Sequence, residues 1–207
     1  MGSIPIVSTK YRDSTTETLQ SCGSVELFHS QVVIVPDDKD WTWVLHRRCS
    51  DCGFDASGTV AGDVPEFIRE NSTRWRQLTA SGAIRPGRPD EWTWSPLEYA
   101  CHVRDVYRRY LDRISLMLAE HDPLFPNWDQ AATAVDDDYE SQEPGRVAEQ
   151  LGDVAEALAF RLSRLAPEQW SRPGRRSDGA SFTVDSISRY MIHDPIHHIW
   201  DVTASHT

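Results

Sequence analysis

Three histidines have the residue type and the spacing of a metal site. His193 and His197 are four residues apart in a stretch of helical character, which places both side chains on one face of an α-helix, about 6 Å apart along its axis. Two neutral imidazoles supply half of a metal site, and a catalytic site normally has three protein ligands and an open position. We expect His102, on another helix, to be the third ligand of one divalent ion.

Carboxylates spaced to approach these histidines are expected in the outer shell of the site, because a ligating imidazole usually donates its second N–H to a carboxylate or carbonyl. The candidates, each three or four residues from a histidine, are Glu98, Asp105 and Asp201. Asp201 is preferred, since it follows His197 by one helical turn. His198 is rotated about 100° from His197 on a helix and is expected to point elsewhere.

A Cys-x-x-Cys segment is a second candidate for metal binding. Cys49 and Cys52 are followed directly by Gly53, a pattern in which backbone amides can approach a thiolate-bound metal. His46 could add a third ligand, but Cys22 would have to come from a distant stretch to complete four. Two reduced thiols in a tight turn are the alternative, and a redox role lacks the βαβ unit in which such motifs occur.

The composition is that of a globular protein with a single core. The 207 residues are 39% hydrophobic and 26% charged, with four cysteines and a net charge of -11. This charge repels nucleic-acid phosphates and anionic membranes, so neither is expected as a partner. With no run of roughly 18 apolar residues and no signal sequence, a cytoplasmic location is expected. The oligomeric state is left open between a monomer and a homodimer.

Four segments have the apolar period of helices that could position the histidines. They are expected at residues 64–83, about 96–121, about 143–166 and 183 to about 202. In the last of these, Pro195 removes a backbone hydrogen bond, which predicts a kink. Residues 1–24 lack an apolar period and are expected to form a loose arm, whereas the β-branched run Val25–Val35, which contains His29, predicts one short strand or extended segment.

Two long connections separate these helices. Residues 123–142 contain Trp128 and an acidic run, and a connection of this length is either a binding loop or lid, or a solvated acidic turn. Residues 167–182 carry the densest positive cluster of the chain, formed by Arg172, Arg175 and Arg176. These arginines could bind the carboxylate of an acidic substrate or cofactor, or be solvated.

These elements resemble the DinB-like family of metal-dependent helical bundles, which includes mycothiol-dependent maleylpyruvate isomerases and bacterial thiol S-transferases. The resemblance covers roughly residues 64–202, and the stretches that carry it are Trp94–Asp105, Asp122–Asp129 and His193–Val202. It implies an all-α four-helix bundle with long connecting loops and a short irregular or extended N-terminal segment. It also makes His102, His193 and His197 the metal ligands. We expect a division into an N-terminal extension, residues 1–63, and the bundle, residues 64–207.

The resemblance implies a metal-dependent S-transferase or isomerase. A metal ion would lower the pKa of a low-molecular-weight thiol such as mycothiol and present the thiolate to a small electrophilic substrate. Zinc is the expected metal, although three neutral nitrogens and water also suit nickel, iron or manganese. The cavity is expected between the second long loop and the ends of the second and fourth helices. The alternative is a non-catalytic metal-binding interaction or sensing module, which a closed fourth ligand would favour.

Overall fold

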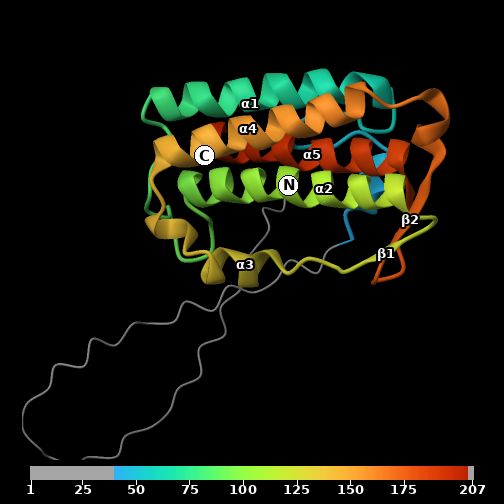
Figure 1. Ribbon diagram of the computed structural model, residues 1–207. Coiled ribbons are helices and arrows are strands. Elements are labelled where there is room, and N and C mark those ends of the chain that lie inside the picture. Colours follow the sequence, from blue (N-terminus) through green and yellow to red (C-terminus); the bar gives the residue numbers. More distant parts are fainter. Residues whose placement is uncertain (1–39, 205–207) are drawn as a thin grey trace, which may run out of the picture.

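Four long helices pack side by side in the computed structural model, which describes residues 40–204 (Figure 1). They are α1 (Val64–Ala80), α2 (Pro96–Ala119), α4 (Pro144–Ser163) and α5 (Val184–Thr203). Helices α1 and α2 each pack against both α4 and α5. The predicted all-α four-helix bundle is confirmed, and the helix ends agree with the predicted ones within a few residues. The arm, the Val25–Val35 segment and Cys22 lie outside the described residues.

The two long connections are joined to each other at one end of the bundle. Strand β1 (Leu124–Phe125) lies in the first connection, and β2 (Pro173–Arg176) and β3 (Ser181–Thr183) lie in the second. They form one sheet in the order β1-β2-β3, with β1 parallel to β2 and β2 antiparallel to β3. Figure 1 shows β1 and β2 near one end of the helices. The two connections that were predicted as loops therefore both cover this end of the bundle.

Short helices occupy the remaining connections. Helix α3 (Gln130–Asp136) packs on the outside of α2. The 3₁₀ helices are η1 (Thr42–Leu45), η2 (Ala61–Asp63), η3 (Tyr139–Ser141) and η4 (Pro167–Ser171). Helices η1 and η2 both pack against α5. The segment before α1 therefore lies against the helix that carries His193 and His197.

Local sequence signals determine where the two histidine-bearing helices begin. The Ser95 hydroxyl accepts a hydrogen bond from the Glu98 amide while the Glu98 carboxylate accepts one from the Ser95 amide, the reciprocal capping box that satisfies two free helix amides. Pro96 follows as the first residue of α2. Thr183 caps α5 by accepting from the Ser186 amide. Helix α5 then continues through Pro195 to Thr203.

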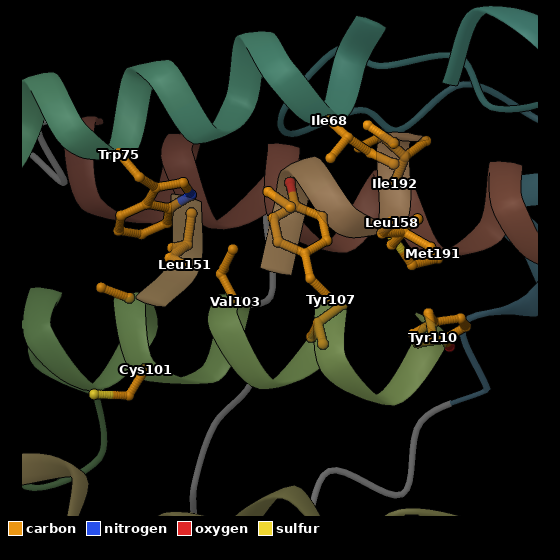
Figure 2. Packing of buried hydrophobic residues seen from close by; sticks show 14 of the residues in the cluster. Ile68, Trp75, Cys101, Val103, Tyr107, Tyr110, Leu151, Leu158, Met191 and Ile192 are labelled. Atoms are coloured by element: carbon orange, nitrogen blue, oxygen red, sulfur yellow. The ribbon is translucent and has the colours of Figure 1, made fainter. Parts of the chain in front are cut away.

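The bundle interior contains apolar side chains and a buried series of hydrogen bonds that joins three helices. In Figure 2, Trp75 of α1 and Val103 and Tyr107 of α2 point into the space between the helices. The Tyr107 hydroxyl donates to Asn71 Oδ1 at 2.8 Å, and Asn71 Nδ2 donates to the Pro195 carbonyl at 2.8 Å. These two hydrogen bonds link α2, α1 and α5. No helix among residues 40–204 is long and apolar enough to cross a membrane.

Replacing Asn71 with Ala should lower the free energy of unfolding by about 1 to 3 kcal/mol, because it leaves the Tyr107 hydroxyl buried without a partner and removes the bond between α1 and the Pro195 carbonyl. Chemical denaturation of the parent and variant measures this difference. Arg74→Ala, at an exposed position on the same helix, is the control and should change stability by less than about 0.5 kcal/mol. Equal effects of the two substitutions would contradict the role given to Asn71.

Candidate metal centres

Within residues 40–204, the side chains placed to bind a metal ion gather in two groups around α5. The first, called the His-Asp-His group, consists of His102, Asp194 and His198. The second, called the Cys-His group, consists of Cys49, Cys52, His193 and His197. Within each group the potential ligand atoms all lie within 4.8 Å of one another. Each group therefore has the dimensions of a site for one ion.

The two groups use adjacent faces of the same helix. His193 and His197 form one pair four residues apart, and Asp194 and His198 form a second pair shifted by one residue. A shift of one residue turns a side chain by about 100° around a helix. One pair consequently faces the Cys-x-x-Cys turn, while the other meets His102 of α2.

The His-Asp-His group is centred on the Asp194 carboxylate. Asp194 Oδ1 lies 3.3 Å from His102 Nε2 and 3.1 Å from His198 Nε2. Two ligand atoms at about 2.0–2.2 Å from one ion lie roughly 3–3.5 Å apart, so these distances suit a shared ion as well as a hydrogen bond. His102 is fully buried, whereas one third of the Asp194 side chain (33%) is accessible. The group is therefore open on the side of Asp194.

A second carboxylate holds the far nitrogen of His198. Asp201 Oδ2 lies 2.7 Å from His198 Nδ1, so the ring directs Nε2 toward Asp194. A carboxylate on the non-ligating nitrogen fixes the tautomer and orientation of a metal-binding histidine. The His102 Nδ1 atom, in contrast, has no hydrogen-bonding partner within residues 40–204. Of the two histidines, only His198 is therefore oriented by a hydrogen bond to its second nitrogen within the described residues.

In the absence of a metal, the carboxylates and imidazoles of this group stabilise each other's charged forms. Burial would raise the pKa of the Asp194 carboxyl, but the charges of His102 and His198 and their hydrogen bonds hold it well below its usual range. Burial would likewise lower the pKa of His198, but Asp194 and Asp201 raise it to about 10. An ionised carboxylate therefore faces the centre of the group at neutral pH.

None of the three residues of the His-Asp-His group lines the pocket of about 760 Å³, but neighbours of the group do. Trp128 lines this pocket and also stacks on the His102 ring, with the ring centroids 5.1 Å apart. Tyr190, one helical turn before Asp194, lines it as well, together with Trp41 of the segment before α1. The connection that carries Trp128 thus contributes a wall of the pocket.

The Cys-His group joins the Cys-x-x-Cys turn to α5. Cys49 Sγ lies 3.6 Å from His197 Nδ1, and both residues are buried. The buried Nε2 atom of His193 has no hydrogen-bonding partner in the described part of the chain. Trp41 covers the two imidazoles, with ring centroids 5.9 Å from His193 and 5.7 Å from His197.

Burial governs ionisation in the Cys-His group. It lowers the pKa of His193 to about 4, with the charge of His197 acting in the same direction, so this imidazole is neutral at pH 7. Burial also raises the pKa of the Cys52 thiol to about 12, against the opposing hydrogen bond of the Phe54 backbone amide. A bound dication reverses this balance, because a coordinated thiol loses its proton.

The three histidines expected at one site belong to different groups. His193 and His197 lie together, as their spacing predicts, but the structure brings His102 to Asp194 and His198 instead. Asp194 and His198 are candidate ligands that were not predicted from the sequence. Their signal was present as a second pair four residues apart, and it was missed because His198 was judged only by its rotation from His197 and Asp194 was not considered as a ligand.

The predicted outer-shell carboxylates have separate roles. Asp201 lies closer to His198 than to His197, with Oδ1 at 3.7 Å from His197 Nε2. Glu98 caps α2 and accepts hydrogen bonds from Arg88. Asp105 contacts two arginines and a tyrosine hydroxyl, namely Arg104, Arg108 and Tyr139.

The three clustered arginines do not act as one patch. Arg172 donates to the Met117 carbonyl near the end of α2, and Arg175 pairs with Asp122 at 2.9 Å. Arg176 lines the pocket, where it pairs with Asp178 and donates to the Tyr190 hydroxyl at 3.3 Å. Of the three, Arg176 is the one placed to meet a ligand in the pocket.

The family model described as the DinB superfamily matches residues 37–202. The chain belongs to the DinB superfamily. The matched range includes the Cys-x-x-Cys segment, which the sequence resemblance alone did not cover. Among solved structures, the chain is similar to YfiT from Bacillus subtilis, with a TM-score of 0.54 and 17% identity over 89% of this chain and 92% of that one. Among curated proteins, none matches.

YfiT is described as a probable metal-dependent hydrolase with an unusual four-helix bundle topology. At 17% identity this likeness establishes the shared fold of the two proteins. The arrangement of α1, α2, α4 and α5 is therefore a known DinB architecture, and the chemistry of this chain has to be argued from its own side chains.

The metal-free protein should lose stability as the pH rises above about 6.5, because the pKa of His198 is raised to about 10 in the folded state. The stabilisation is complete below the unfolded-state pKa near 6.5 and is lost on approach to pH 10, at no more than about 1.4 kcal/mol per pH unit. Denaturant unfolding of chelator-treated protein at pH 6.5 and 8.5 measures the slope. His198→Gln should flatten it, and His121→Gln, at an exposed site, should leave it unchanged.

Proposed function

We propose that this DinB protein is a metal-dependent enzyme whose divalent ion is held by His102, Asp194 and His198. The observation that carries the proposal is a three-ligand group in which the Asp194 side chain is partly accessible and His102 stacks on Trp128, a residue that lines a pocket. Two imidazoles and one carboxylate with open positions form a common catalytic ligand set, which suits iron, manganese, nickel or zinc. When bound there, the ion would supply Lewis-acid activation of a nucleophile.

The chain's own residues would prepare the site in three ways. Asp201 orients His198 by accepting a hydrogen bond from its Nδ1. Trp128 stacks on the His102 ring and Trp94 contacts it at a tilt, with centroids 5.1 and 5.3 Å away, and both shield it from water. Tyr190 and Arg176 would offer hydrogen-bond donors to a polar group of the substrate in the pocket.

A low-molecular-weight thiol is our first candidate for the nucleophile, as the sequence resemblance to mycothiol-dependent members implies. The reaction would then be S-transfer to, or thiol-assisted isomerisation of, a small electrophile. Water is the second candidate, and the description of YfiT as a probable hydrolase favours it. A carboxylate in the ligand set also favours oxygen donors. The alternative of a non-catalytic module agrees less well with a partly accessible Asp194.

The assay that tests this proposal uses protein reconstituted with zinc, manganese, nickel or iron. A panel of small electrophiles and esters is supplied with and without mycothiol. Turnover that requires thiol supports transfer or isomerisation, and turnover without thiol supports hydrolysis. His102→Ala and Asp194→Ala should each lose one metal ion per chain and more than about 100-fold of the activity, which exceeds the usual effect of outer-shell changes.

His121→Ala is the matched control for the ligand variants, because His121 is exposed at the end of α2. It should keep the metal content and the activity of the parent. Full metal content in both His102→Ala and Asp194→Ala would overturn the ligand assignment. Absence of any metal-dependent turnover, with metal bound as expected, would favour the non-catalytic module.

Arg176→Gln should raise KM for an acidic substrate or thiol by about tenfold while kcat changes little, as expected when a group binds substrate and transition state equally. Steady-state kinetics separates the two parameters. Arg175→Gln removes the same charge from a residue that pairs with Asp122 and is absent from the pocket lining. It should leave KM within twofold, and equal effects of both variants would show that only the overall charge matters.

A further inference from the structure

We propose that Cys49, Cys52, His193 and His197 bind a second ion, a structural zinc that ties the segment before α1 to helix α5. This site is separate from the one proposed for catalysis, since the two share no ligand. Two thiolates and two imidazoles are a common ligand set of structural zinc sites. The structure brings them together from positions 49 and 197, which are 148 residues apart.

The distances within the group fit tetrahedral zinc. A zinc–sulfur bond of about 2.3 Å and a zinc–nitrogen bond of about 2.0 Å, at a tetrahedral angle, place sulfur and nitrogen about 3.5 Å apart. Cys49 Sγ and His197 Nδ1 are 3.6 Å apart. The buried Nε2 of His193, which has no hydrogen-bonding partner in residues 40–204, supplies a further donor atom.

The turn between the cysteines has the conformation that a metal-binding knuckle requires. The Cys49 amide donates to the Phe54 carbonyl at 2.9 Å, and the Gly53 amide donates to the Cys49 carbonyl at 3.1 Å. Gly53 has a φ of 75°, a left-handed conformation that favours glycine. The folded turn thereby presents both sulfurs to α5 while the chain reverses its direction.

The four ligands form a closed site. Cys49, His193 and His197 are buried and Cys52 is half-buried, so four protein ligands would satisfy the ion and leave no position for substrate. Trp41 lies against both imidazoles, and Trp43 lies against His193 with a centroid distance of 6.2 Å. This closed arrangement contrasts with the accessible carboxylate of the His-Asp-His group and indicates a structural role.

The segment that would be tied down has little regular structure of its own. Between residues 40 and 60, η1 is its one helix, and the chain contributes few fully buried side chains, those of Val44, Cys49 and Ala56. Arg189 of α5 adds one hydrogen bond, to the Ala56 carbonyl at 3.0 Å. Because a structural ion adds its binding free energy to the folded state, zinc is a suitable anchor for such a segment.

Zinc-edge X-ray absorption tests the ligand set directly. It is measured on Asp194→Ala protein loaded with one equivalent of zinc, so that the other proposed site does not contribute. We expect two sulfur ligands at about 2.3 Å and two nitrogen ligands at about 2.0 Å. A zinc shell without sulfur would overturn the proposal, as would a Cys49–Cys52 disulfide in the parent, identified by mass spectrometry of the proteolytic peptides.

The variant Cys49→Ser/Cys52→Ser should lose one zinc per chain while it retains the ion bound by the His-Asp-His group. Its Tm should fall by about 5 °C or more. Trypsin should cut it after the exposed Arg47 or Arg48 at least about tenfold faster than the parent, because the segment opens locally. Full zinc content in this variant would contradict the site.

Two single cysteine variants serve as controls. Cys101→Ser should keep the zinc, since Cys101 is not part of the group. Cys22→Ser should keep it as well, because the four proposed ligands do not include Cys22, and loss of zinc in either variant would overturn the four-ligand assignment. If the double cysteine variant fails to fold, the X-ray absorption result on protein with both cysteines still decides the question.

Discussion

The contact between the Asp194 carboxylate and the imidazoles of His102 and His198 is the interaction on which the candidate metal site of this DinB bundle depends. An ionic group that is largely removed from water needs partners, and the partly accessible Asp194 obtains one from α2 and one from its own helix. This contact therefore requires a fixed rotation of α5 about its axis and a fixed position of α5 along α2. The Asn71 side chain contributes from the opposite side, since it bonds both Tyr107 and the Pro195 carbonyl.

The helices could be predicted because the information that specifies them is local. Apolar residues recur with the helical period, and Ser95 and Thr183 provide caps that can be recognised in sequence. The pair formed by His193 and His197 follows from the same geometry. The partner of that pair could not be predicted, because periodicity does not tell which side of α5 faces α2. A rotation of one residue decides between His193 and Asp194, and only the tertiary packing determines it.

Contacts between connections that are distant in the sequence could not be predicted from local sequence patterns either. The pairing of β1 with β2 unites residues near 124 with residues near 175, and strands this short give no signal of their own. The same pairing separates Arg176, at the pocket, from Arg175, which turns toward Asp122. The Cys-x-x-Cys turn was recognisable, but its imidazole partners lie about 140 residues further along the chain and depend on how the first segment is laid over α5.

Asp201 connects the two groups electrostatically. One of its oxygens lies 2.7 Å from His198 Nδ1 and the other 3.7 Å from His197 Nε2, so one carboxylate faces the outward nitrogen of an imidazole from each group. A cation on either ring strengthens the N–H on its far side as a donor, and the two rings then compete for the same negative charge. If both proposed sites bind an ion, occupancy of one would alter the affinity of the other, and thermodynamic linkage would make the effect equal in both directions. An affinity measured for either site would then have meaning only when the occupancy of the other is stated.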